Sequence, residues 1–245
     1  SYTDESFYRK NEFNRQIIFN NVTSQVNQTY KERQHNYFAG INIGADYYIN
    51  SKNIFGFKIT SFGGNEMDKR IADVFIENSD LTSRSSSSGR DSSHPWSYND
   101  ANINFEHSFD TVGTKLVFSA NYTYNYDLYG GDYFNHFVDQ KKDSLLPSLL
   151  FKADNYIYLN IGAAKLDFEK KFKKDFKLET GLKETYINMI SDFTFKTTTT
   201  AGSNYVIDSS LTNVFNYEET ISAAYLNLQG SYKKLNLQAG VRAEN

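Results

Sequence analysis

The chain has 245 residues, a formal net charge of −3 and a sequence pI of about 5.8, so it lacks the basic excess that draws proteins to nucleic acid. It contains no cysteine, which excludes disulfides and thiolate metal sites. No apolar run reaches the roughly 18 residues of a transmembrane helix, and the first residues, SYTDESFYRKNEF, lack the apolar core of a signal peptide. A mean hydropathy of −0.60 still permits a transmembrane β-barrel, because half of each strand faces a polar interior.

Alternation of apolar and polar residues predicts nine strands. In chain order they cover residues 14–27, 36–49, 54–62, 101–110, 114–126, 155–169, 175–195, 217–230 and 234–245. The pattern is clearest in KLVFSANYTYNY, where Phe118 and Ala120 share one face while Ser119 and Asn121 share the other. In the strand over 155–169 the apolar residues change face, and we expect a β-bulge near Gly162 to reconcile the two halves.

The expected connections alternate in length. Short ones, INSKN, DTVGT, KKFKKD and GSYKK, follow the second, fourth, sixth and eighth strands. Long ones cover 63–100, 127–154 and 196–216. In an up-and-down meander, alternate connections lie at opposite ends of the sheet. Short turns at one end and long loops at the other are typical of outer-membrane barrels, whose extracellular loops are the long ones.

A soluble β-sandwich or lipocalin-like barrel would show the same alternation. The expected strands, however, exceed the usual length of about 5–6 residues and suit a tilted membrane crossing of about 9–11 residues. Their polar faces also carry much charge and glycine for a dry core. The pattern therefore favours an apolar face toward lipid and a polar face toward a wet interior.

Tyrosines gather where the strands end, although tyrosine is also a good strand former in general. Tyr47 and Tyr48 precede a short turn, while Tyr122, Tyr124 and Tyr126 precede a long loop. Amphipathic rings prefer the headgroup level of a membrane, so these residues are expected to form aromatic girdles at its two surfaces.

Three segments carry a family signal: GADYYINSKNIFGFKITS, AKLDFEKKFKKDFKLETGLKETYINMISDF and FNYEETISAAYLNLQGSYKKLNLQAGVRAEN. They resemble the outer-membrane β-barrel of TonB-dependent-receptor-like proteins, in the subgroup abundant in Bacteroidota, over about residues 36 to 245. The resemblance implies a barrel of roughly 22 strands around an N-terminal plug. No plug or partner-binding box is found in these residues, and nine strands are an odd number whereas single-chain barrels close with an even one. We therefore expect all of residues 1–245 to belong to one larger antiparallel up-and-down barrel.

Signals for chemistry are weak. The four histidines, His35, His94, His107 and His136, show no ligand spacing, and His107 shares parity with phenylalanines, as expected of a girdle or surface residue. Serines next to histidines in a strand point to opposite faces and cannot form a catalytic triad by themselves. We expect no catalytic residue, no metal site and no cofactor.

Two sets of residues are candidates for contact with a ligand or partner. Aromatic residues in the expected loops are the first set: Trp96, Tyr98, Tyr129, Tyr133, Phe134 and Phe137. Polar residues expected to line the lumen are the second: Lys58, Asn121, Lys183, Gln238 and Arg242. Aromatics of the first set could equally pack the loops together or cap the upper girdle.

These observations predict a barrel in the cell outer membrane, surrounded by its lipid. The first functional hypothesis is ligand uptake of the TonB-dependent type, which needs a periplasmic energy-transducing partner if a plug exists. The second is a non-transporting scaffold subunit of an outer-membrane complex, partnered by a surface-exposed lipoprotein or other subunits. A soluble secreted β-domain that binds sugar is a third hypothesis.

Overall fold

The computed structural model describes residues 1–19, 22–80, 82–139, 148–172, 176–198, 204–232 and 235–245. All regular secondary structure in these ranges is β-strand: β1 (Tyr2–Phe19), β2 (Val22–Asn50), β3 (Asn53–Asn78), β4 (Ser83–Ser108), β5 (Lys115–Asp139), β6 (Leu149–Phe172), β7 (Phe176–Thr198), β8 (Val206–Ile207), β9 (Asn213–Tyr232) and β10 (Leu235–Glu244). Among these residues no helix is long and apolar enough to cross a membrane.

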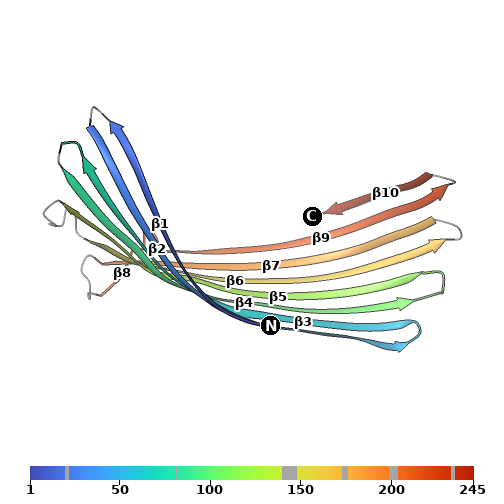
Figure 1. Ribbon diagram of the computed structural model, residues 1–245. Helices are drawn as coiled ribbons and strands as arrows, with labels where there is room; N and C mark the ends of the chain where they lie inside the picture. The colour runs from blue at the N-terminus through green and yellow to red at the C-terminus, as the bar shows by residue number, and fades with distance from the viewer. Residues whose placement is uncertain (20–21, 81, 140–147, 173–175, 199–203, 233–234) are drawn as a thin grey trace.

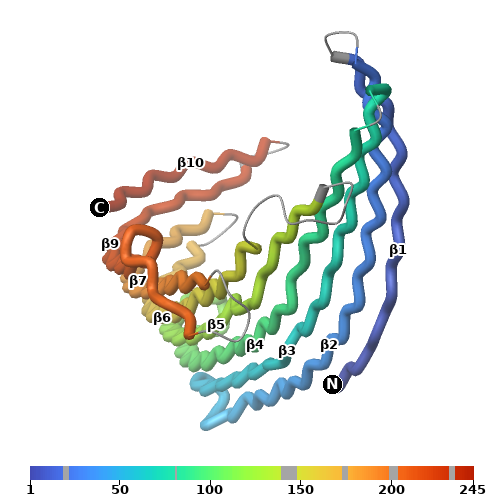
Figure 2. Tube along the Cα trace, turned by 90° about the vertical axis from the view of Figure 1, so that its left-hand side faces the viewer, coloured from blue at the N-terminus to red at the C-terminus, as the bar shows by residue number. Residues whose placement is uncertain are grey.

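The described strands form one antiparallel, ten-stranded up-and-down sheet. Each strand pairs with the next along the chain, except that the short β8 pairs with β7 and β9 follows β7 in the sheet. Figure 1 shows the strands as long, bent ribbons, and Figure 2 shows the sheet curling from β1 on one side round to β10 on the other. This is the all-β, up-and-down architecture that the alternating pattern predicts, in the form of a curved wall of a barrel.

Strands β1 to β7 and β9 are far longer than a membrane crossing needs. β2 has 29 residues, which at about 3.3 Å per residue reaches roughly 95 Å, whereas about 9–11 residues suffice for a tilted crossing. The amine of Ser1 donates a hydrogen bond to the Gly40 carbonyl partway along β2. Farther from the short turns than this point, strands β1 to β4 bend upward (Figure 1). Gly64 pairs with Phe38 nearby, and a Cβ there would lie 2.3 Å from the Tyr37 carbonyl oxygen. Only glycine permits this close approach.

Two expectations need correction, one for a strand and one for a long connection. The strand expected over 14–27 is in fact two strands, because β1 ends at Phe19, β2 begins at Val22, and these residues pair. The loop expected over 63–100 is mostly a hairpin, in which β3 and β4 stay paired from Phe62 opposite Tyr98 to Glu77 opposite Ser83.

The other two expected loops are also shortened. Over 127–154, β5 and β6 remain paired as far as Asn135 opposite Leu149, while residues 140–147 lie outside the described ranges. Over 196–216, β7 runs to Thr198 and the short β8 pairs with its end, while residues 199–203 lie outside the described ranges.

Polar residues on both faces explain why these strand extensions escape a periodicity analysis. A strand with water on both sides needs no apolar face, so alternation disappears from the sequence. Serine and acidic or amide side chains instead bond across the strands. Ser87 Oγ donates to Asp73 Oδ1 at 2.7 Å, and Ser93 Oγ donates to Asn65 Oδ1 at 2.9 Å.

The bulge expected near Gly162 is absent. Gly162 pairs with Tyr122 on one side and Tyr186 on the other, and the register continues unbroken through both ladders. β6 is therefore apolar on both faces at different heights: Ile157, Leu159 and Ile161 lie on one face, and Ala164, Leu166 and Phe168 lie on the other. A change of parity in the sequence here marks two apolar surfaces rather than a register shift.

The short turns are held by side-chain caps. Asn50 Oδ1 accepts hydrogen bonds from the backbone amides of Lys52 and Asn53. Asp110 Oδ1 accepts three, from Val112, Gly113 and Thr114, each at 2.9 Å. Gly113 has a φ of 111°, which L-residues with a side chain rarely adopt. For the other two short connections, residues 173–175 and 233–234 lie outside the described ranges.

Candidate ligand-binding face

Cross-strand pairing sorts the sheet into two faces, because directly paired residues point to the same side. Lys58 pairs with Asn102, and Asn102 pairs with Asn121, so these three side chains share a face. The pairings continued through β10 place all five residues expected to line the lumen on that same side: Lys58, Asn121, Lys183, Gln238 and Arg242. This side is called the polar face below.

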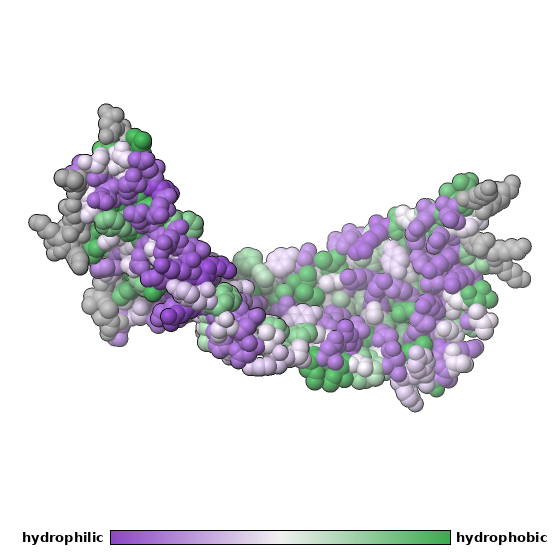
Figure 3. Space-filling model, in the orientation of Figure 1, coloured by the Kyte–Doolittle hydropathy of each residue, from purple (hydrophilic) through white to green (hydrophobic). Residues whose placement is uncertain are grey.

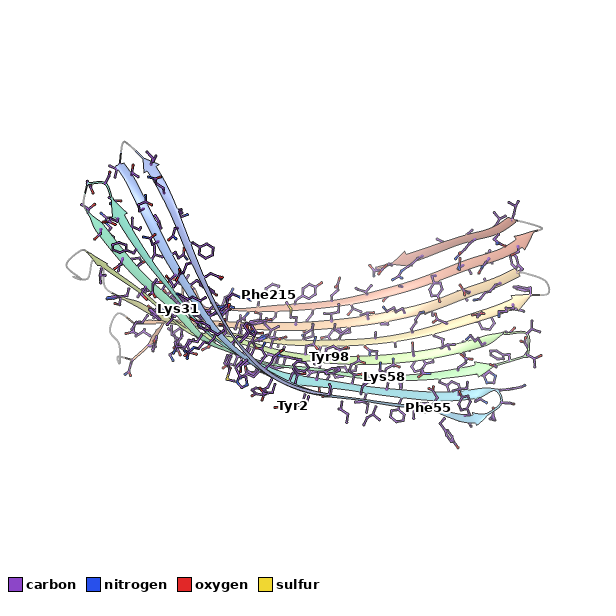
Figure 4. The ribbon with its side chains drawn as sticks, viewed as in Figure 1. Tyr2, Lys31, Phe55, Lys58, Tyr98 and Phe215 are labelled. Carbon is purple, nitrogen blue, oxygen red and sulfur yellow. The ribbon has the colours of Figure 1, made fainter. Side chains whose placement is uncertain are left out.

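The polar face is the concave side of the sheet. In Figure 4, Phe55 and Tyr2, which belong to the opposite face, are labelled along the convex lower side. Buried side chains such as Val26, Glu32 and Thr123 also lie on the polar face, as expected of the concave side. The curvature crowds one set of side chains and spreads the other.

Near the short turns, the polar face carries a network of ion pairs and hydrogen bonds. Lys115 Nζ lies 3.0 Å from Glu106 Oε2, and Lys165 Nζ lies 2.7 Å from Asp167 Oδ2. The hydroxyl of Tyr225 donates to Asp167 Oδ1 as well. Such paired, partly exposed groups fit a wet interior and would be costly against lipid.

The opposite, apolar face exposes large hydrophobic side chains. Phe118 is 38% exposed, Leu182 61% and Leu237 65%. Such a contiguous apolar surface marks contact with lipid or with another protein. Figure 3 shows how hydrophilic residues dominate the raised end formed by β1 to β4, whereas hydrophobic ones are spread along the rest of the sheet.

The tyrosines expected in an upper girdle cluster on the apolar face. Tyr122, Tyr124 and Tyr126 of β5 pair with residues of β6, among them Tyr158, whose ring centroid lies 5.4 Å from that of Tyr126. The hydroxyl of Tyr122 donates to Asn160 Oδ1 at 2.7 Å. The rings thus form a band with hydrogen-bonding partners at the upper limit of the apolar surface, as interfacial rings do.

The six aromatic residues expected in loops lie instead in strands β4 and β5. The pairings put five of them on the polar face, and the exception on the apolar face is Phe134. They do not form one cluster. Trp96 lies near Phe38, with ring centroids 6.4 Å apart, and Tyr129 stacks on His94 at 4.0 Å.

A third aromatic group lies higher on the polar face. Tyr133 stacks on Phe151 with ring centroids 4.6 Å apart and an interplanar angle of 2°, and Phe151 continues the stack to Phe195 at 5.2 Å. Phe137 lies on the same face, farther along β5. The aromatic residues therefore line the inner side of the wall above the polar network.

Sequence reasoning missed a row of charges beside this aromatic group. We name it the charge ladder: Arg9, Glu32, Asp68, Arg70 and Arg90. Glu32 and Asp68 are each only 3% exposed. Their signal lay in DKR and GRD, inside a segment interpreted as a loop; strand parity there would have put the charges on one face.

The ladder joins four strands through short ion pairs. Arg70 Nε lies 2.9 Å from Glu32 Oε1 and 2.6 Å from Asp68 Oδ2. Arg9 Nη1 lies 3.4 Å from Glu32 Oε2, and Arg90 Nη2 contacts Asp68 Oδ2. Buried carboxylates of this kind require cationic partners, because an unpaired buried charge is strongly unfavourable.

The histidines are dispersed. His107 lies on the apolar face with Phe105, stacks edge-on against Phe109 at 4.6 Å, and contacts Asn53 Oδ1 at 2.7 Å. His94 Nε2 lies 3.0 Å from Asp127 Oδ1. Within the described ranges, no three histidine, cysteine or acidic side chains gather as a metal site would need.

Comparison with known proteins gives one family. The model of the outer membrane protein β-barrel family matches residues 107–245. No curated protein matches the chain. Among solved structures, the translocator domain of the autotransporter NalP from Neisseria meningitidis is 6% identical with a TM-score of 0.15, over 99% of this chain and 86% of that one.

Proposed function

This chain belongs to the outer membrane protein β-barrel family and lies in the outer membrane, and from that premise we propose that it forms part of a ligand-uptake barrel of the TonB-dependent-receptor type, as found in Bacteroidota. The supporting observation is the division of the concave face. A network of partly exposed ion pairs covers its lower part, and aromatic groups beside the charge ladder cover its upper part. A ligand descending such a wall meets stacking and charged groups first and a wet lining afterwards.

The same features suit the capture of a ligand too large for simple diffusion. Aromatic side chains bind with large rigid surfaces, and a few fixed polar groups give orientation. Tyr129 is 52% exposed and Tyr98 37% exposed on the concave face, so both rings have surface left for contact. The height of the wall extends this surface well beyond the membrane.

An uptake experiment in cells tests the proposal. Cells that carry or lack the gene are supplied with a fluorescently labelled mixture of neutral and acidic oligosaccharides larger than porins admit, with and without a protonophore. We expect accumulation that needs both the gene and the membrane energy, since uptake of this type draws on a periplasmic energy-transducing partner. Accumulation that is the same in both strains would contradict the proposal.

The scaffold hypothesis has one observation in its favour. Three polar residues, Glu184, Asn188 and Glu218, lie on the apolar face among residues such as Leu182 and Tyr186. Asn188 Nδ2 donates to Glu218 Oε1 at 3.1 Å. Lipid chains offer such groups no partner, whereas a neighbouring subunit or a lipoprotein would.

Purification in mild detergent distinguishes the two functions. Two results together would support the scaffold. The protein carries a stoichiometric partner that is lost on the double change Glu184→Leu and Glu218→Leu, and the unchanged protein imports no ligand. A barrel that purifies without such a partner and imports ligand supports uptake.

A further inference from the structure

A pocket opens beside the charge ladder on the polar face, with a volume of about 310 Å³. The depression forms because two small residues, Ala72 and Ser88, lie opposite each other in β3 and β4. Tyr30 pairs with Ala72 on one side, and Asn135 pairs with Ser88 on the other, so larger polar side chains rise at both ends. The volume is at the small end for ligand pockets.

The pair of residues next to Ala72 and Ser88 on the side toward the membrane is positively charged and forms one wall of the pocket. Arg70 and Arg90 both line it, with side chains about one-third exposed, at 36% and 32%. The carboxylates that partner them, Glu32 and Asp68, do not line it and are nearly buried. The guanidinium groups therefore stand between the buried carboxylates and the open pocket.

The charge ladder holds more cation than anion. It contains three guanidinium groups and two carboxylates, since Arg9 pairs with Glu32 while Arg70 bridges to Glu32 and Asp68. A guanidinium has five N–H donors, and the contacts to the two carboxylates do not use them all. The spare donors that Arg70 and Arg90 present to the pocket, rather than the total charge of the ladder, favour an oxyanion there, above all a planar carboxylate that can accept two parallel hydrogen bonds.

An aromatic wall completes the pocket. Tyr133 and Phe151, stacked at 4.6 Å, both line it beyond Arg90. Phe151 is stacked between Tyr133 and Phe195, so the ring face left for the apolar side of a sugar is that of Tyr133. Ser88 and Asn135 supply hydroxyl and amide groups for sugar hydroxyls. Positive charge, aromatic surface and small polar groups thus converge within one depression.

We propose that this pocket binds a uronic-acid-type saccharide unit, with the carboxylate on Arg70 and Arg90 and the ring against Tyr133, whose position the stacked Phe151 fixes. The inference rests on the proposed uptake function and names the class of ligand that would be captured. A free inorganic anion would use the arginines alone and gain nothing from the aromatic wall.

Binding to the purified full-length protein in detergent tests this assignment. Titration calorimetry compares digalacturonate, its neutral counterpart galactobiose, and sodium sulfate. We expect digalacturonate to bind about tenfold or more tightly than either, which corresponds to one charge-assisted interaction of about 1.4 kcal/mol. Equal affinity for the acidic and neutral sugars, or for digalacturonate and sulfate, would overturn the proposal.

Matched variants test whether the preference for digalacturonate arises in this pocket. Arg90→Gln should lower the affinity for digalacturonate to the level of the neutral sugar. Arg9→Gln removes a cation from the same ladder without lining the pocket and should leave the preference intact. Ser88→Leu fills the floor and should abolish binding of digalacturonate without changing any charge. Equal losses in Arg9→Gln and Arg90→Gln would contradict a local site, and heat-modifiable migration reports that each variant still folds.

Failure of this inference is distinguishable from failure of the proposed function. Energy-dependent uptake of oligosaccharides by a protein with no preference for acidic sugars would contradict the uronic-acid site and support the uptake function. A tenfold preference for the acidic sugar in a protein that imports nothing would support the uronic-acid site and contradict the uptake function.

Discussion

Asp68 and Arg70 lie two residues apart on β3 with Arg70 Nε 2.6 Å from Asp68 Oδ2, and both point to the concave face. Asp68 is 3% exposed and also contacts Arg90, so one buried carboxylate pairs with two guanidinium groups. The stability of the raised part of the wall, formed by β1 to β4, therefore depends on a charge that solvent does not reach.

Replacing this carboxylate should destabilise the protein. Asp68→Ala leaves Arg70 and Arg90 without their shared partner. Loss of one member of a buried pair costs about 3–5 kcal/mol, and because the two arginines are partly solvated we expect about 2 kcal/mol. Denaturant unfolding of the purified protein measures the change in the free energy of unfolding.

A surface ion pair on the neighbouring strands provides the control. Asp91 lies 3.5 Å from Lys69, and both side chains are more than half exposed. Asp91→Ala should cost about 0–1 kcal/mol, as exposed pairs do. Equal costs for the two variants would contradict the special position of Asp68.

The two faces of β5 should respond oppositely to arginine. Phe118→Arg places a charge on the apolar face and should cost about 2–4 kcal/mol if that face meets the membrane interior. Asn121→Arg, three residues on, places the same charge on the concave face, where Asp100 Oδ2 already accepts from the Asn121 amide at 2.6 Å. Folding into detergent or lipid, followed by heat-modifiable migration, measures both, and a larger penalty at Asn121 would reverse the assignment of the faces.

Strand positions near the short turns could be predicted because one side of each strand there is apolar. Where lipid or a core faces one side, alternation is enforced and the parity of Phe118 against Asn121 can be read directly. The short turns were predictable for a similar reason, since Asn50 and Asp110 are residues that cap turns through their own side chains.

The raised wall could not be predicted, because nothing there enforces alternation. The serine run that forms much of β4 has water on both sides and resembles a loop in composition, although its hydroxyls bond across to β3. The charge ladder and the pocket lie in this part, so the candidate site was hidden with it. Of the residues predicted for ligand contact, Tyr133 and Phe134 line that pocket, whereas Trp96 and Tyr129 lie in separate groups lower on the face.

The turn between β4 and β5 should weaken in acid. Three backbone amides donate to Asp110 and, with the Thr114 amide foremost, lower the pKa of this carboxyl from 3.8 to about 2. A carboxyl whose pKa is lower in the folded state stabilises fully above the unfolded value, and its contribution is lost as the pH falls from about 4 to about 2. Asp110→Asn keeps an acceptor but no longer titrates, so the stability advantage of the natural protein over this variant should shrink across that window. Unfolding midpoints between pH 6 and pH 2 measure it, and an advantage constant with pH would contradict the role of the charge.

The same turn should be sensitive to a side chain at Gly113. Its φ of 111° lies where other residues are strained, so Gly113→Ala should cost about 1–3 kcal/mol. The new Cβ would also lie 3.0–3.2 Å from the flexible Lys171 side chain, which can move aside, so strain of the backbone dominates the cost. Gly162→Ala is the matched control, because Gly162 lies in a regular strand and an added Cβ meets no atom within 4 Å. That change should be neutral or slightly stabilising, since alanine restricts the unfolded chain more than glycine does. Denaturant unfolding of both variants gives the comparison, and a Gly113→Ala protein as stable as Gly162→Ala would show that the turn tolerates an ordinary backbone.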